Sequence, residues 1–175
     1  AARWGVEAFK ARETFAHTST SGERVAGADY RIVAQWFQRP ALRGIAMADS
    51  GIGSVEDYAG KSVSFWAFAA TEVITAMSLA GISLDDVTVR PKGFTVNDVL
   101  PGSSPGVDVA HGMLFNEVGQ LLATVNEETG DLFRREDFTL VEFNNTAMLQ
   151  DGLSVDRTWL ESDEHNVDIT RRFVK

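Results

Sequence analysis

The sequence predicts an α/β protein with a parallel or mixed sheet. The chain has 175 residues, of which 44% are hydrophobic and 23% are charged. That composition is typical of one globular domain or of two small lobes. Short apolar runs bounded by glycine or proline alternate with amphipathic segments. Strands that alternate with helices in this way favour a sheet with parallel neighbours.

The predicted strands are short runs of β-branched and other apolar residues. The first covers 30–34 and ends before Pro40, which cannot donate to the ladder of a central strand. Lys61 opens a second clear strand at 62–66. The remaining strands are predicted at 44–48, 87–89, 107–113 and 138–143.

Helix signals separate these strands. Ser54 is a natural N-cap for a short helical turn, since Glu56 and Asp57 follow it. A helix is predicted over 71–80, with Gly81 as its stop. The polar run 18–23 is interpreted as a surface loop. Further helices are predicted at 6–15, 97–100, 116–124, 156–160 and 167–174.

Charge and residue usage exclude several classes of function. The formal net charge of −9 would repel nucleic acid and anionic membranes, so no nucleic-acid partner is expected. The absence of cysteine excludes disulfides, thiolate metal sites and cysteine nucleophiles. The three histidines lack metal-ligand spacing, and no catalytic motif is present, so neither a metal, a cofactor nor a catalytic residue is expected. No apolar run reaches the ~20 residues that span a bilayer.

Ligands of open α/β sheets bind beyond the carboxyl ends of the strands, beside the following helix N-termini. That rule selects four segments, at 35–38, 65–72, 113–117 and 144–146. The candidate ligand-binding residues in them are Gln35, Phe37, Trp66, Phe68, Glu72, Met113, Asn116, Glu117 and Asn144.

Aromatic faces beside amide and carboxylate groups suit a flat, polar or nitrogenous small molecule. We expect such a ligand to stack on Trp66 and to be hydrogen-bonded by Asn116 or Glu117. Two interpretations of Glu117 stay open, because a first-turn glutamate also stabilises its own helix dipole. Phe37 either lines the ligand-binding cleft or is a core residue, and His111 either reaches that cleft or is structural.

Several strings resemble one family when they are taken together and in order. They are VAQWFQR at 33–39, DSGI at 49–52, YAGKSV at 58–63, MLFNE at 113–117, NEETGDLF at 126–133 and TAMLQDG at 146–152. From about residue 30 onward, the chain resembles type II periplasmic solute-binding proteins of ABC importers. The most similar branch serves nitrate, taurine, sulfonates and thiamine-pyrimidine precursors.

The resemblance implies two α/β lobes joined by two crossover strands. It implies that 1–60 belong to lobe 1, 61–143 form lobe 2, and 144–175 return to lobe 1. Lobe 1 is expected to be incomplete and the chain to be partial. Phe115 stands where the branch has a tyrosine, so the family's ligand does not transfer directly.

The function that the resemblance implies is ligand binding without catalysis. The chain is expected to be the extracytoplasmic substrate-binding component of an ABC importer, a monomer whose partners are a small solute and a membrane permease. One alternative is an enzyme on the same fold, similar to the thiamine-pyrimidine synthase, although that family carries a cysteine-rich motif and this chain has no cysteine. Another is a sensory or degenerate binding domain.

Overall fold

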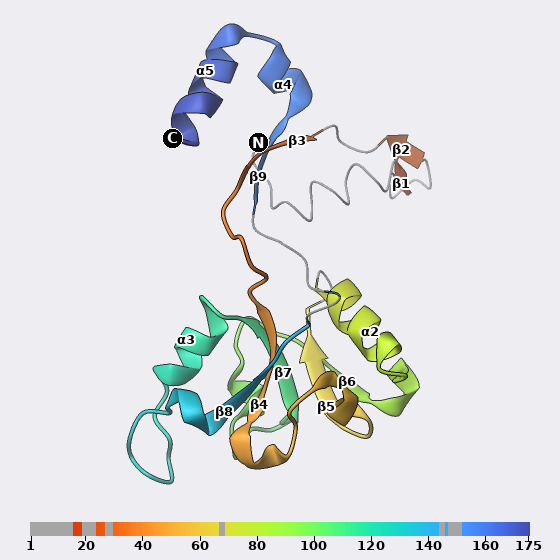
Figure 1. Cartoon of the computed structure of the whole chain (residues 1–175), viewed down its shortest axis with the longest axis vertical. Coiled ribbons are helices and arrows are strands. Elements are labelled where there is room, and N and C mark those ends of the chain that lie inside the picture. Colours follow the sequence, from red (N-terminus) through yellow and green to blue (C-terminus); the bar gives the residue numbers. More distant parts are fainter. Residues whose placement is uncertain (1–15, 19–23, 27–29, 67–68, 144–145, 147–151) are drawn as a thin grey trace. The chain divides into compact units, whose positions relative to one another are not determined.

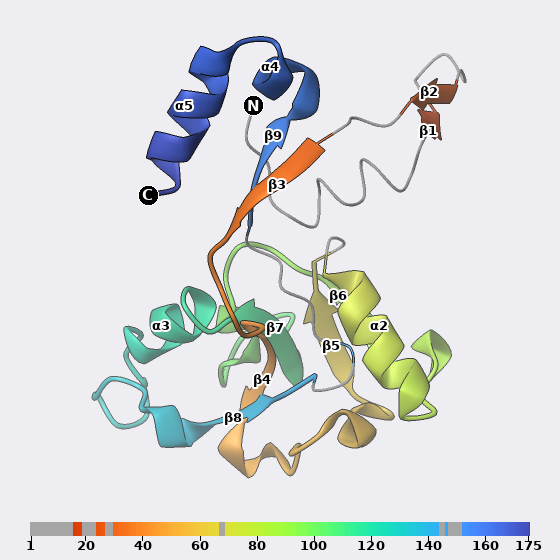
Figure 2. The same ribbon diagram turned by 45° about the horizontal axis from the view of Figure 1, so that its top comes forward.

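The computed structural model describes residues 16–18, 24–26, 30–66, 69–143, 146 and 152–175. The chain divides into two compact units. Unit 1 comprises Ala1–Pro40 with Leu149–Lys175, and unit 2 comprises Ala41–Met148. Figures 1 and 2 show the elements of both units.

Unit 2 is built on a five-stranded mixed sheet with the order β6-β5-β7-β4-β8. Strand β5 pairs in parallel with β6 and with β7, whereas β4 runs antiparallel to both β7 and β8. The carboxyl ends of β5, β6 and β7 therefore lie at one edge of the sheet, which we call the carboxyl edge. The strands are β4 (Leu42–Met47), β5 (Ser62–Phe65), β6 (Thr88–Pro91), β7 (Val109–Met113) and β8 (Phe138–Val141).

One helix packs on each face of this sheet. Helix α2 (Ala70–Leu79) shares a core cluster with Val63 and Val109, and α3 (Glu117–Leu122) shares a second cluster with Ala110. Val109 and Ala110 are consecutive, so the strand alternation sends their side chains to opposite faces. The unit is therefore a three-layer α/β/α arrangement, as Figure 1 shows. Short 3₁₀ turns complete it: η1 (Ala48–Ser50), η2 (Val55–Tyr58), η3 (Leu84–Asp86), η4 (Asn97–Val99) and η5 (Arg135–Asp137).

Helix α2 follows from its sequence pattern. Val73, Ala76 and Met77 are buried and lie on one face, at the i, i+3, i+4 spacing of an amphipathic helix. Gly81 takes a left-handed φ of 77° just past the end, where a residue with a Cβ would be strained. Ser54 is the N-cap of the turn η2. One Asp57 oxygen accepts the backbone N–H groups of Gly53 and Ser54, each at 2.9 Å.

Unit 1 contains two antiparallel pairs and two helices in its described part. Strand β1 (Ala16–Thr18) pairs with β2 (Arg24–Ala26), and β3 (Tyr30–Gln35) pairs with β9 (Gly152–Asp156). Strand β9 continues into α4 (Arg157–Glu161) and α5 (Glu164–Phe173).

The predicted α/β class is confirmed, as are most of the elements that it was built on. The predicted helix at 97–100 is only the 3₁₀ turn η4, because Leu100 already has an extended backbone. Strand β9 was not predicted. The predicted helix at 6–15 and most of the predicted loop at 18–23 lie outside the described residues.

The boundary of the second compact unit differs from the predicted lobe boundary. Residues 41–60 were assigned to lobe 1, yet β4 lies within them and hydrogen-bonds to β7 and β8 of unit 2. The physical reason is that strand pairing over long sequence distances, rather than local composition, decides to which unit β4 belongs.

Candidate functional site

The carboxyl edge gathers the segments that follow three parallel strands. Trp66 follows β5, Lys92 follows β6, and the turn from Leu114 to Asn116 follows β7 and leads into α3. This is the edge at which open α/β sheets bind their ligands. The strands align their ends here because Phe65 stands opposite Pro91 in the parallel ladder.

Trp66 is anchored in the protein rather than freely presented. Its side chain belongs to the α2-side core, and the residue is only 8% exposed. The indole Nε1–H donates a hydrogen bond to the carbonyl of Gly93 at 2.9 Å. The Lys92 ammonium lies 5.6 Å from the ring centroid, within the range of a cation–π contact. Trp66 therefore ties the segment after β5 to the loop after β6.

Lys92 is a buried cation at this edge. Its side chain is 0% exposed, and Nζ donates to the carbonyl of Thr95 and to Oδ1 of Asp98, the latter at 3.4 Å. The other Asp98 oxygen accepts from the Ser64 hydroxyl at 2.7 Å. Burial lowers the pKa of Lys92, while the charges of Asp98 and Glu117 act in the opposite direction. Lys92 thus links the loop after β6 to Asp98 and, through the Asp98–Ser64 hydrogen bond, to β5.

Glu117 closes the turn between β7 and α3. It is only 3% exposed, and Oε2 accepts the backbone N–H of Met113 while Oε1 accepts the side-chain amide of Asn116, both at 2.8 Å. An ideal Cβ on Gly112 would lie 2.6 Å from the Cβ of Glu117, so a side chain there would displace the glutamate. Both carboxylate oxygens already have partners within the protein, which supports the structural interpretation of this residue. Its predicted ligand contact stays a prediction.

His111 lies in the core under the carboxyl edge and is 0% exposed. Nδ1 is 2.8 Å from the carbonyl of Ser64, which can only accept, so Nδ1 carries the proton. The bare Nε2 faces the Tyr58 hydroxyl at 3.4 Å, and the ring stacks on Phe143. Burial lowers the pKa of His111 to about 4, so the ring is neutral at pH 7. Of the two interpretations of this residue, the structure supports the structural one.

The other predicted residues lie in several places. Glu72 is 1% exposed in the first turn of α2, and Met113, the last residue of β7, is 8% exposed. Asn116 is exposed, and its amide oxygen accepts from Gln120 at 3.1 Å. Gln35 and Phe37 belong to unit 1, at the end of β3 and just beyond it. Phe68 and Asn144 lie outside the described residues.

Sequence reasoning missed the segment after β6. Lys92 and Asp98 were not selected, nor was Phe94, which is 87% exposed in the same loop. The signal was available, because the rule about carboxyl ends applies to the strand predicted at 87–89 as well as to its neighbours. The described residues contain no group of three or more His, Asp or Glu side chains that could hold a metal ion.

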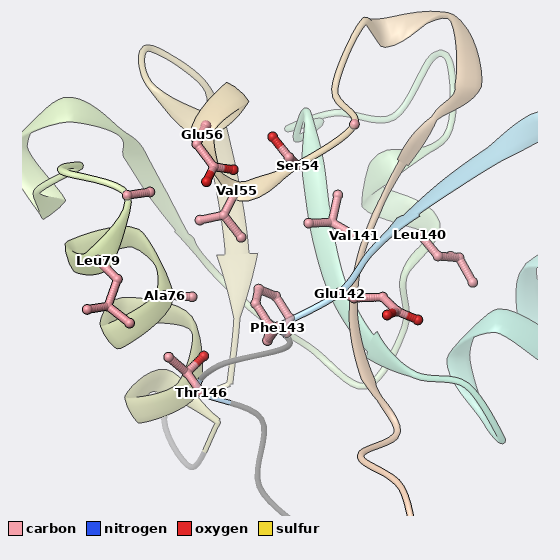
Figure 3. A pocket seen from close by; sticks show the side chains of 12 residues that line it. Ser54, Val55, Glu56, Ala76, Leu79, Leu140, Val141, Glu142, Phe143 and Thr146 are labelled. Atoms are coloured by element: carbon pink, nitrogen blue, oxygen red, sulfur yellow. The ribbon is translucent and has the colours of Figure 1, made fainter.

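A separate cavity of about 430 Å³ lies between the last turns of α2, the turn η2 and the end of β8. Figure 3 shows Phe143 pointing into it, with Ala76 and Leu79 on the α2 side and the carboxylates of Glu56 and Glu142 at its rim. None of the described residues that were predicted to bind ligand lines this cavity. It supplies a control region for tests of the carboxyl edge.

The chain matches one protein family over most of its length. The family described as NMT1/THI5 like matches residues 14–168. No curated protein sequence matches the chain. No helix in the part of the chain that the structure describes is long and apolar enough to cross a membrane.

Solved structures of solute-binding proteins share the fold. The periplasmic aliphatic sulphonate-binding protein SsuA from Escherichia coli has 18% identity and a TM-score of 0.57, over 81% of this chain and 43% of that chain. The alkanesulfonate-binding protein SsuA from Xanthomonas axonopodis pv. citri, bound to MOPS, has 17% identity and a TM-score of 0.54, over 82% of this chain and 46% of that chain. A periplasmic binding protein from Brucella ovis with glutathione bound has 15% identity and a TM-score of 0.53, over 81% of this chain and 40% of that chain. This chain therefore spans less than half the length of each of these three structures.

Proposed function

Because this chain belongs to the NMT1/THI5-like family, we propose that it is the substrate-binding part of an ABC importer and binds a small, planar, nitrogenous solute at the carboxyl edge of unit 2. The observation that carries the proposal is that Trp66, Lys92 and Asn116 each follow the carboxyl end of a strand at the same edge of the sheet. Ligands of open α/β sheets bind at that position.

The charge of unit 2 supports a nitrogenous ligand rather than an anion. Residues 41–148 include fifteen acidic and six basic residues, a net charge of −9, which is the net charge of the whole chain. Its one lysine at the carboxyl edge, Lys92, has a fully buried side chain that hydrogen-bonds to Asp98. A sulfonate or nitrate would approach against this field, whereas an uncharged nitrogenous solute would not be repelled by it.

The rest of the proposal follows from the family. Unit 2 would form one lobe, and unit 1 together with further chain would form the other. Closure of the two lobes would stabilise the ligand-bound protein by contacts that the open state lacks. The loaded protein would dock on a membrane permease, which places it outside the cytoplasm. Binding to the permease and location are parts of this proposal.

Calorimetric titration of the 175-residue chain tests the proposal. The probes are 4-aminopyrimidine, ethanesulfonate and nitrate. We expect 4-aminopyrimidine to bind, and the variant Asn116→Ala to weaken its affinity by about threefold to tenfold because one exposed polar contact is lost. The matched control Leu79→Ala, in the cavity of Figure 3, should leave the affinity unchanged. Binding of ethanesulfonate or nitrate alone would contradict the proposed ligand class.

A further inference from the structure

We propose that loop 92–96 is a fixed platform that presents Phe94 as the aromatic contact for the bound ligand, and that Lys92 is the positioning residue of this platform. The inference rests on the proposed function and names a contact that neither the family match nor the sequence assigned. The loop lies at the carboxyl edge, directly after β6.

The loop is held from both sides of Phe94. On one side, the carbonyl of Gly93 accepts the indole N–H of Trp66 at 2.9 Å. On the other, the carbonyl of Thr95 accepts from the buried ammonium of Lys92. The Thr95 hydroxyl also accepts the backbone N–H of Asn97 at 3.2 Å. The backbone on either side of Phe94 is thus fixed by side chains of the folded unit.

The loop also has a buried anchor. Val96 is 0% exposed in the α3-side core, and its carbonyl accepts the N–H of Val99 at 3.1 Å as η4 begins. Phe94, two residues earlier, is 87% exposed. The backbone of a loop with three anchors is ordered in advance, so a ligand that contacts Phe94 would have to order only its side chain.

Lys92 holds loop 92–96 in place because its ammonium contacts three separate parts of the unit. It contacts Thr95 within the loop, Asp98 in η4 and the ring of Trp66 after β5. Asp98 is itself held by the Ser64 hydroxyl of β5. Removing the ammonium leaves the Thr95 carbonyl and the Asp98 carboxylate without this donor, and the Trp66–Gly93 hydrogen bond is then left to link the loop to the segment after β5.

The aromatic character of the contact distinguishes it from general apolar packing. A phenyl face stacks on a planar ring but has no such preference for a saturated ring of the same size. The probes are therefore 4-aminopyrimidine and cyclohexanol, both six-membered rings with one polar substituent and no charge at neutral pH. The variants are Phe94→Ala, Phe94→Tyr and Lys92→Met, and the control is Phe173→Ala, which removes another exposed phenylalanine, in α5.

Titration calorimetry of the full chain is the first measurement. Phe94→Ala should weaken the binding of 4-aminopyrimidine by about tenfold and leave the much weaker binding of cyclohexanol unchanged. Phe94→Tyr should restore the affinity to within about twofold, because the ring is retained. Phe173→Ala should have no effect. Unchanged affinity in Phe94→Ala, with the unmodified chain binding 4-aminopyrimidine, would overturn this inference and leave the proposed function intact.

Amide hydrogen exchange without ligand tests the platform independently. In Lys92→Met, exchange at Asn97 and Val99 should rise by about tenfold or more, while exchange in α2 stays unchanged. Unchanged exchange in this loop would show that Lys92 does not position it. If Lys92→Met fails to fold, Asp98→Asn gives the same readout, because it removes the ion-pair partner of Lys92. Failure of 4-aminopyrimidine to bind the unmodified chain would contradict both the proposed function and the ligand contact of Phe94.

Discussion

Acidification should destabilise unit 2 through His111 over a defined pH range. Burial lowers the pKa of this histidine to about 4 from its ordinary 6.5. Because the unfolded chain binds the proton more readily than the folded one, stability rises with pH between these two values. The contribution is therefore fully present above pH 6.5 and is lost as the pH falls to about 4. Each pKa unit corresponds to about 1.4 kcal/mol, so the total is roughly 3 kcal/mol.

This range is separate from that of the carboxylates whose pKa the structure lowers. Backbone N–H donors lower the pKa of Asp57 and Asp86, and hydrogen bonds from Ser62 outweigh burial to lower that of Asp108. Their contributions are present above the ordinary aspartate value and are lost only as the pH falls through the lowered ones. Of these four groups, His111 is the one that titrates between pH 4 and 6.5.

Two assays measure the effect. Urea unfolding followed by circular dichroism between pH 7.5 and 4 should show the loss in the unmodified chain and a flatter profile in His111→Asn, which keeps a donor for the Ser64 carbonyl. NMR of the imidazole proton signals should show His111 titrating near pH 4. Equal pH slopes in the two proteins, or a His111 midpoint near 6.5, would refute the reasoning.

Three further predictions follow from the packing around the carboxyl edge and η2. Gly44→Ala should lower the free energy of unfolding by about 1–3 kcal/mol in a urea titration, because the added Cβ would lie 2.0 Å from the Tyr58 hydroxyl. Gly53→Ala is the control, because its added Cβ would lie 3.9 Å from the nearest atom. Glu117→Gln should cost about 1–2 kcal/mol, because an amide group replaces one of two acceptors; an unchanged unfolding midpoint would contradict that role. Asp57→Asn should lower the melting temperature at pH 7, and the difference should shrink as the pH falls below the ordinary aspartate range, because the contribution of the lowered pKa is lost there.

Local patterns in the sequence were sufficient for the elements of unit 2 that depend on neighbouring residues. The strand at 62–66 and the helix at 71–80 were found because apolar spacing and Gly81 define them within a few residues. The strand at β4 was predicted, but local patterns could not show that it belongs to unit 2. Its partners β7 and β8 lie far along the chain, and hydropathy gives no register between strands so distant. Strand β9 was missed for the same reason, since it is defined by its pairing with β3.

The candidate site shows a similar limit. Trp66, Met113 and Glu117 were found from their positions at strand ends, but their burial was not, because burial depends on neighbours that only the fold brings together. Lys92 illustrates this most clearly. A lysine in a polar loop is normally a surface residue. Only the approach of Asp98 and Trp66 explains why its side chain is fully buried.

Mapping of a bound ligand by NMR tests the central proposal most directly. The measurement is the change of backbone amide shifts when 4-aminopyrimidine is added to the ¹⁵N-labelled chain. We expect the largest changes at Trp66, at Gly93 and Phe94, and at Asn116, around the carboxyl edge of β5, β6 and β7. Changes centred on Ser54 and Leu79, which line the cavity beside α2, or no changes in unit 2 at all, would contradict it.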